Sequence, residues 1–97
     1  MPLFHLVTRS AWQDAVARGA YRAALARDGF IHLSTERQWP GARARFFAGV
    51  ADVVLVVIDD TRLRSPVRYE RADGDDFPHL YGPLDLDAVI EVRDLDP

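Results

Sequence analysis

The sequence predicts a single small domain of the α+β class, and three observations support this prediction. The chain has 97 residues, which is enough for one hydrophobic core but not for two. Its hydrophobic content of 48% excludes general disorder. The longer helix-like patterns lie in the first half of the chain, whereas strand-like runs dominate the second half. We therefore expect one α+β domain over residues 1–97.

The chain begins with a predicted strand and helix. Residues 3–7 form a short apolar run that is typical of a strand. Thr8 and Ser10 are candidate N-caps of a helix over residues 11–18, and Gly19 is its expected stop. Apolar residues spaced i, i+3 and i+4 form the predicted buried stripe of this helix: Trp12, Ala15 and Val16.

A second strand and helix complete the first half. The alanine-rich residues 21–27 are compatible with a short helical turn, and the Asp-Gly pair at 28–29 predicts a tight turn. Residues 30–33 then predict a strand. A helix is expected over residues 34–48, capped by a hydroxyl residue at its start, with a kink or a restart at Pro40. Its predicted buried face consists of Ala42, Phe46 and Phe47.

Strands dominate the second half. Residues 52–59 are apolar at nearly every position, which predicts a central strand covered on both faces. The remaining expected elements are a strand over 66–71, an acidic loop over 72–76, an extended segment over 77–83, a helical turn over 86–88 and a last strand over 89–93.

Missing residue types exclude several kinds of chemistry. Without cysteine the chain has no thiol nucleophile, thiolate metal site or redox pair. All 12 basic residues are arginine, which excludes a Schiff-base lysine and a Walker-type phosphate loop. No signal peptide precedes the first strand, and no apolar run reaches the length of about 20 residues that spans a bilayer. We expect a cytoplasmic protein that has no membrane partner.

Charge is distributed unevenly along the chain. Residues 1–48 hold 7 arginines and 3 acids, whereas residues 49–97 hold 5 arginines and 12 acids. The net charge of −3 argues against nucleic acid as a general partner. A basic patch in the first half is nevertheless suited to a phosphorylated small molecule.

The three histidines lie at similar places, each within a short apolar run: His5, His32 and His79. A single histidine in such a run is usually a hydrogen-bonded core residue, but three of them favour a shared cleft. A metal site with Glu70 as a further ligand is the alternative. The sequence lacks the close histidine spacing of such sites, so we expect no metal.

Ser34 follows His32 by two residues, which places both side chains on one face of an extended segment. Ser34 is also a candidate helix cap, and the amides at the start of a helix form an anion site. Further along the same predicted helix, Arg43 and Arg45 are expected to face solvent rather than a ligand.

Two more residue pairs are spaced to share a strand face. Arg68 and Glu70 form one pair, which is either a solvated ion pair or a catalytic pair. In the catalytic alternative the carboxylate serves proton transfer or stabilises a cationic sugar, with Arg68 on a phosphate. His79 and Tyr81 form the other pair, and Tyr81 is positioned either to stack on a ligand ring or to fill one end of the fold.

Several stretches together resemble a known family: FHLVT (4–8), GFIHLST (29–35), RFF (45–47), VRYE (67–70) and FPHLYGPLDLDAV (77–89). The chain resembles the bacterial family known as domain of unknown function 952. More remotely, the same pattern is similar to RNA 2′-phosphotransferases and the ADP-ribosyltransferase superfamily. The remote resemblance implies an ADP-ribosyltransferase-like split β-barrel of two small mixed or antiparallel sheets with two or three helices, which grips NAD as cofactor.

The remote resemblance also implies roles for individual residues. His5, followed by the hydroxyl residue Thr8, would hold the ribose or phosphate on the nicotinamide side. His32 and Ser34 would line the same cleft, and Glu70 would stand where many transferases place their catalytic glutamate. RNA 2′-phosphotransferases differ in two ways, because they carry an arginine at the position of Phe4 and have a larger RNA-binding lobe.

Transfer of ADP-ribose creates a cationic ribosyl centre, which a carboxylate stabilises while arginines hold the pyrophosphate. The expected catalytic residues are Glu70, His32 and Arg68. The expected residues binding NAD are His5, Thr8, Arg9, Ser34, His79 and Tyr81. Three functions stay open: an NAD-dependent transferase or NAD-cleaving enzyme, a non-catalytic module that binds a nucleotide or ADP-ribose, and a small interaction domain with structural histidines.

Overall fold

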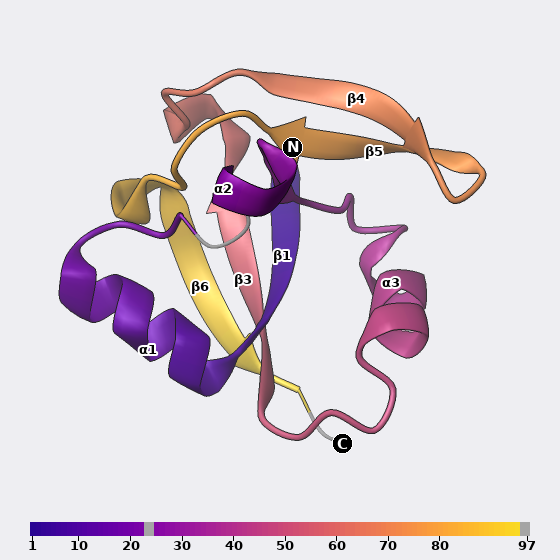
Figure 1. The fold of residues 1–97 in the computed structure, drawn as a ribbon, viewed down its shortest axis with the longest axis horizontal. Helices are drawn as coiled ribbons and strands as arrows, with labels where there is room; N and C mark the ends of the chain where they lie inside the picture. The colour runs from indigo at the N-terminus through magenta and orange to yellow at the C-terminus, as the bar shows by residue number, and fades with distance from the viewer. Residues whose placement is uncertain (23–24, 96–97) are drawn as a thin grey trace.

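Two three-stranded antiparallel sheets and three helices form the fold in a computed structural model, which describes residues 1–22 and 25–95 (Figure 1). The first sheet has the order β1 (Pro2–Thr8), β3 (Val53–Asp59), β6 (Val89–Asp94). The second sheet has the order β2 (Ile31–His32), β5 (Asp75–Leu80), β4 (Val67–Ala72). The helices are α1 (Arg9–Arg18), α2 (Leu25–Asp28) and α3 (Trp39–Phe46), with 3-10 turns η1 (Asp60–Arg62) and η2 (Leu86–Ala88). The predicted α+β class is confirmed.

The apolar strand β3 lies in the middle of the first sheet and is covered on both faces, as predicted. Val54, Val56 and Ile58 join the main core, whereas Leu55 and Val57 join a smaller cluster on the opposite face. The alternation follows from the two-residue period of a strand. Apolar clusters therefore cover both faces of β3. The radius of gyration of the chain is 12.4 Å.

Helix α1 packs against the main core through a narrower stripe than predicted. Thr8 caps its start by accepting a hydrogen bond from the backbone nitrogen of Ala11 at 3.4 Å, and Gly19 ends it with a φ of 82°. Trp12 and Ala15 are buried, but Val16 is 52% exposed. The prediction for Val16 is wrong because the helix contacts the core along one edge only.

Helix α3 begins later than the sequence predicts. Residues 36–38 form a turn, and the helix starts at Trp39, so that Pro40 lies in its first turn where its missing N–H costs nothing. The predicted kink or restart at Pro40 is therefore wrong, because no helix precedes Trp39, and a hydroxyl cap at residue 34 or 35 is not found. The expected buried face is also wrong, since Phe46 is 59% exposed and Ala42 and Phe47 are only half-buried.

The segment predicted as an acidic loop is a tight hairpin turn between β4 and β5. Asp73 and Gly74 adopt φ angles of 51° and 80°, as a two-residue hairpin turn requires. Asp73 pairs with Arg45 at 3.2 Å and Asp75 pairs with Arg37 at 2.7 Å, so the turn is joined to α3 and the segment before it. Hydrogen bonds from Arg37 and Gln38 lower the pKa of Asp75 to about 2.

The chain passes from one sheet to the other at Leu33. His32 pairs with His79 in the second sheet, whereas Ser34 forms a bridge with Phe4 of β1 through two backbone hydrogen bonds of 2.8 Å. The predicted strand over 30–33 is therefore shortened to two residues. In the alanine-rich segment, α2 covers residues 25–28, and residues 23–24 lie outside the described part of the chain.

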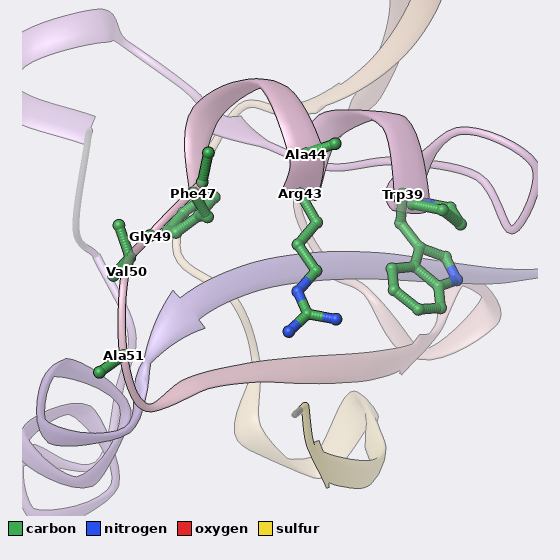
Figure 2. A pocket seen from close by; sticks show the side chains of 9 residues that line it. Trp39, Arg43, Ala44, Phe47, Gly49, Val50 and Ala51 are labelled. Carbon is green, nitrogen blue, oxygen red and sulfur yellow. The ribbon is translucent and has the colours of Figure 1, made fainter. Parts of the chain in front are cut away.

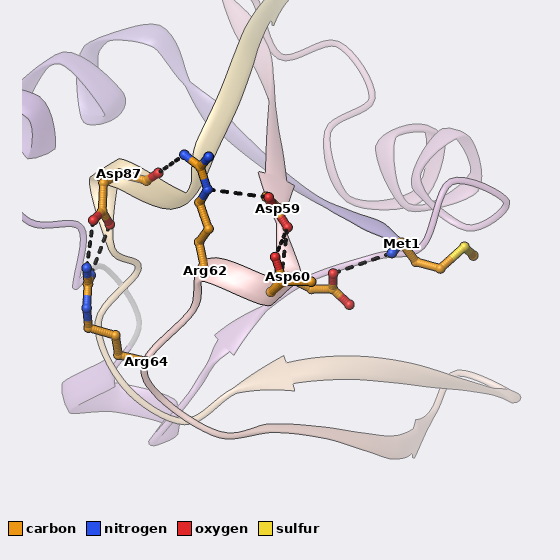
Figure 3. A network of polar contacts seen from close by, with 7 residues as sticks. Met1, Asp59, Asp60, Arg62, Arg64 and Asp87 are labelled. Atoms are coloured by element: carbon orange, nitrogen blue, oxygen red, sulfur yellow. Dashed lines mark hydrogen bonds and ion pairs between the residues drawn. The ribbon is translucent and has the colours of Figure 1, made fainter.

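Polar contacts join the N-terminus to η1, and join η1 and Arg64 after it to η2 (Figure 3). The amino group of Met1 lies 3.4 Å from Asp60, and Arg64 pairs with Asp87 at 2.7 Å. Both pairs are at the surface, where such contacts add little stability. Within the described ranges, 1–22 and 25–95, no helix is long and apolar enough to cross a membrane.

Candidate functional site

The candidate site is the outer face of the second sheet. His32, His79 and Arg68 are directly paired across β2, β5 and β4. Residues paired in this way share a face of the sheet. Their neighbours Ile31 and Leu80 point to the opposite face, where they are fully buried in the main core. The row of His32, His79 and Arg68 therefore faces away from the core.

Glu70 accepts two hydrogen bonds on one carboxylate oxygen at this face. The Nδ1 atom of His79 donates to Glu70 Oε1 at 2.8 Å, and the hydroxyl of Tyr81 donates to the same atom. A carboxylate can only accept hydrogen bonds, so the Nδ1 atom of His79 carries the proton. The Nε2 atom of His79 forms no hydrogen bond with the described residues. This arrangement orients the imidazole and leaves its second nitrogen for other partners.

The same hydrogen bonds determine the charge states of Glu70 and Tyr81. Donation by Tyr81, and then by His79, lowers the pKa of Glu70, whose side chain is 40% exposed. Acceptance by Glu70 raises the pKa of Tyr81. At neutral pH the carboxylate is therefore ionised and the phenol keeps its proton.

Arg68 adds a positive charge beside this group. Its guanidinium carbon lies 5.1 Å from the centre of the Tyr81 ring, within the range of a cation–π contact. Arg68 forms none of the ion pairs found among residues 1–22 and 25–95, whereas Arg71 on the same strand pairs with Asp76. Arg68 is exposed and its donors are available to an anion.

Phe30 is the residue at this face that sequence reasoning missed. Its ring stacks on His79 at 4.1 Å between ring centres and lies 4.7 Å from His32 and 5.3 Å from Tyr81. His32 and His79 are themselves 5.4 Å apart, edge to face. The available indication was its spacing, because Phe30 precedes His32 by two residues. We name this set the His79 face: Phe30, His32, Arg68, Glu70, His79 and Tyr81.

His32 is the exposed end of the face. Its side chain is 59% exposed, and Nε2 lies 3.3 Å from the Oδ2 atom of Asp28. Arg27, and to a smaller extent His32, lowers the pKa of Asp28. His32 therefore reaches solvent, whereas His79 is 5% exposed beneath Phe30.

His5 lies on the core side of β1 and both of its ring nitrogens are engaged. Nδ1 donates to the backbone oxygen of His32 at 2.7 Å, and the hydroxyl of Tyr21 donates to Nε2 at 2.7 Å. Burial lowers the pKa of His5 to about 4 and raises the pKa of Tyr21 to about 12. The structure thus brings His32 and His79 together but places His5 in the core, where Tyr21 is the partner that sequence reasoning missed.

Three other expected ligand residues lie away from the His79 face. Thr8 and Arg9 are at the end of β1 that joins α1, far from β4 and β5 (Figure 1). Thr8 caps that helix, and Arg9 pairs with Asp94 of β6. Ser34 is 7% exposed, and its backbone forms the bridge to β1.

Two hollows in the molecule lie away from the His79 face. One hollow of about 490 Å³ lies under α3, and another of about 370 Å³ lies beside η2. Neither is lined by a residue of the His79 face. In the described part of the chain, no cluster of three or more acidic or histidine side chains is arranged to hold a metal ion. An ionised carboxylate, an oriented imidazole and the guanidinium of Arg68 therefore share one face of the sheet. Such an arrangement is suited to acting on one ligand.

Comparison with known proteins identifies relatives whose function is also open. Residues 6–92 match the family model described as protein of unknown function, DUF952. The crystal structure of protein CC0527 from Caulobacter crescentus is 34% identical with a TM-score of 0.89, covering 99% of this chain and 87% of that chain. The solution structure of CC0527 is 35% identical with a TM-score of 0.82, covering 98% and 84%. No protein of curated function matches the chain.

Proposed function

Since the chain belongs to DUF952, a family of unknown function, we propose its activity from the His79 face: cleavage of NAD, or transfer of its ADP-ribose, with Glu70 as the catalytic residue. The observation that carries this proposal is the double hydrogen bond on Glu70 Oε1, from His79 and Tyr81. These donors fix an ionised carboxylate beside a free arginine. ADP-ribosyl chemistry needs both groups.

Glu70 stabilises the charge that develops on the ribose. The bond between C1′ and the nicotinamide nitrogen breaks, and its electron pair leaves with nicotinamide. An oxygen of water, or of an acceptor hydroxyl, then bonds to C1′. Its proton passes to the free Nε2 atom of His79 or to the free oxygen of Glu70, and from there to solvent.

The other side chains of the His79 face match the chemical parts of NAD. Arg68 presents a planar fork that suits an oxygen pair of the pyrophosphate. Phe30 and Tyr81 present aromatic rings on which a pyridine or adenine ring stacks. The exposed His32 supplies a donor for a ribose hydroxyl or a phosphate. This fit supports a nucleotide as the partner.

Release of nicotinamide from NAD by the purified chain is the test of this proposal. Glu70→Gln keeps the size of the side chain but removes its charge, so we expect turnover to fall by about a hundredfold or more. Glu91→Gln is the matched control, because Glu91 is a half-exposed strand carboxylate that pairs with Arg93 instead. Equal turnover by wild type and Glu70→Gln, or no turnover by either, contradicts catalysis.

A non-catalytic nucleotide module is the second candidate, and the position of Phe30 favours it. Phe30 covers the ring of His79, so an approaching ligand meets an aromatic surface before it meets the imidazole. Calorimetric titration with NAD, ADP-ribose and AMP separates the candidates. Binding that survives Glu70→Gln without turnover supports the module, and absence of binding by all three ligands eliminates it.

A further inference from the structure

A second region suited to a ligand lies at helix α3 and the loop that follows it, away from the His79 face. Helix α3 and the loop that follows it enclose a partly open hollow of about 490 Å³, lined entirely by residues 39–51 (Figure 2). The volume is within the range of about 300–1,000 Å³ that is usual for small-molecule sites. Its walls are mainly apolar, and the apolar residues that line it include Trp39, Phe47 and Val50.

One charged side chain lines this hollow. Arg43 is four residues after Trp39 and four before Phe47, so all three lie on one face of the helix. In Figure 2 the guanidinium of Arg43 extends from α3 toward strands β1 and β3, with the ring of Trp39 beside it. The guanidinium therefore leaves α3 on the same side as the ring of Trp39.

Arg43 differs from its arginine neighbours because it has no acidic partner within residues 1–22 and 25–95. Arg37 pairs with Asp75, and Arg45 pairs with Asp73. Arg43 is also half-buried, whereas Arg37 and Arg45 have side chains that are 74% and 61% exposed. A half-buried cation among apolar groups gains more from an anion than an exposed one does.

The sheet face toward which Arg43 extends supplies no charge at its centre. Phe4, Leu55 and Val57 form the buried cluster on that side, and Trp39 packs against it with its ring 6.5 Å from that of Phe4. The register of β6 places Arg93 and Glu91 beside Leu55 and Val57 on this face, and these two charged side chains pair with each other. The residues that line the hollow include no acid, so they offer Arg43 no counter-ion.

We propose that this hollow binds a small apolar monocarboxylic acid. The carboxylate pairs with the guanidinium of Arg43, and the apolar body lies between Trp39 and Phe47. A planar carboxylate matches the fork of an arginine, and an aromatic or aliphatic body matches the walls. This site is separate from the His79 face and does not depend on the proposed action on NAD.

The test uses three probes of equal shape and different charge: phenylbutanoate, phenylbutanol and phenylbutylamine. We titrate each into the isotopically labelled chain and follow the backbone amides and the indole signal of Trp39 by NMR. We expect saturable shifts confined to residues 39–51, with phenylbutanoate binding at least about tenfold more tightly than phenylbutanol and phenylbutylamine binding least.

Variants of the two neighbouring arginines then identify the contact. Arg43→Gln is expected to abolish the tenfold preference for the acid while leaving the affinity for the alcohol unchanged. Arg45→Gln, on the same helix but paired with Asp73, is the matched control and keeps the preference. Equal affinities for acid and alcohol in wild type, a preference that survives Arg43→Gln, or shifts at the His79 face instead of residues 39–51 would overturn the proposal.

Discussion

The molecule contains two histidine–tyrosine pairs whose histidines lie on strands, and their surroundings give them opposite properties. In the core, His5 accepts a hydrogen bond from Tyr21, with ring centres 5.0 Å apart. At the outer face of the second sheet, His79 and Tyr81 both donate to Glu70 instead of to each other. Residue types alone therefore do not determine what such a pair does.

The carboxylate makes the difference. His5 meets only neutral groups, and burial keeps it uncharged, with a pKa of about 4. Its nitrogens have no capacity left for a ligand. His79 is also shielded, but an ionised carboxylate fixes one nitrogen and leaves the other without a partner among the described residues. The first pair is suited to stabilising the fold, and the second to acting on a ligand.

The largest expected effect is that of removing the core histidine. His5→Ala leaves the buried hydroxyl of Tyr21 and the backbone oxygen of His32 without their partner and opens a cavity. We expect the free energy of unfolding to fall by about 3–4 kcal/mol, measured by urea denaturation. His32→Ala, which removes an exposed ring, is the control and should change stability little. A loss for His5→Ala as small as that expected for His32→Ala would contradict a structural role for the core pair.

The pH dependence of folding is the next largest effect. His5 has a pKa of about 4 when folded against 6.5 ordinarily, so the unfolded chain binds its proton more readily. The corresponding stability is fully present above pH 6.5 and is lost as the pH falls toward 4. The loss should total about 3 kcal/mol, measured by urea denaturation at several pH values.

Replacing His5 by glutamine, whose side chain does not titrate, isolates the contribution of His5 to the pH dependence of folding. In His5→Gln the decline between pH 6.5 and 4.5 should be largely absent. Asp75 makes a contribution of the same sign at lower pH, because its folded pKa of about 2 is below the ordinary 3.8. The stability from Asp75 is present above pH 3.8 and is lost between there and pH 2, outside the window of His5. An unchanged slope in His5→Gln above pH 4.5 would contradict the assignment.

Removing one hydroxyl from each pair gives a smaller and more direct contrast. Tyr21→Phe leaves the buried Nε2 atom of His5 without its donor, so we expect a loss of about 1–2 kcal/mol. Tyr81→Phe should leave stability within experimental error, because water reaches that position. It should instead raise the pKa of Glu70, since Tyr81 is the main cause of its lowering. Carboxyl carbon NMR titration measures that pKa, and no rise would contradict the hydrogen bond.

The sequence predicted much of this fold and named five of the six residues that form the His79 face, all except Phe30. A period of two correctly separated the two sides of β3. It could not distinguish His5 from His79, because both lie in short apolar runs and only the packing of two sheets decides which side each faces. The hydroxyl residues at 34 and 35 predicted too early a start for α3, because the backbone of Ser34 is used in the bridge to Phe4. Phe30 was missed because its ring contacts come from a strand far along the chain.

The smallest expected effect on folding is that of Arg68→Gln, and it sharpens the contrast most. Arg68 has no ion pair among the described residues and lies on an exposed strand surface, so its removal should leave the urea midpoint unchanged. If the face binds a phosphate-bearing nucleotide, the same change should weaken binding of ADP-ribose several-fold, measured by calorimetry. Arg71→Gln on the same strand, whose partner is Asp76, should leave that affinity unchanged. Equal weakening by both variants would indicate a general charge effect and not a positioned guanidinium, because only Arg68 is held over Tyr81 beside Glu70.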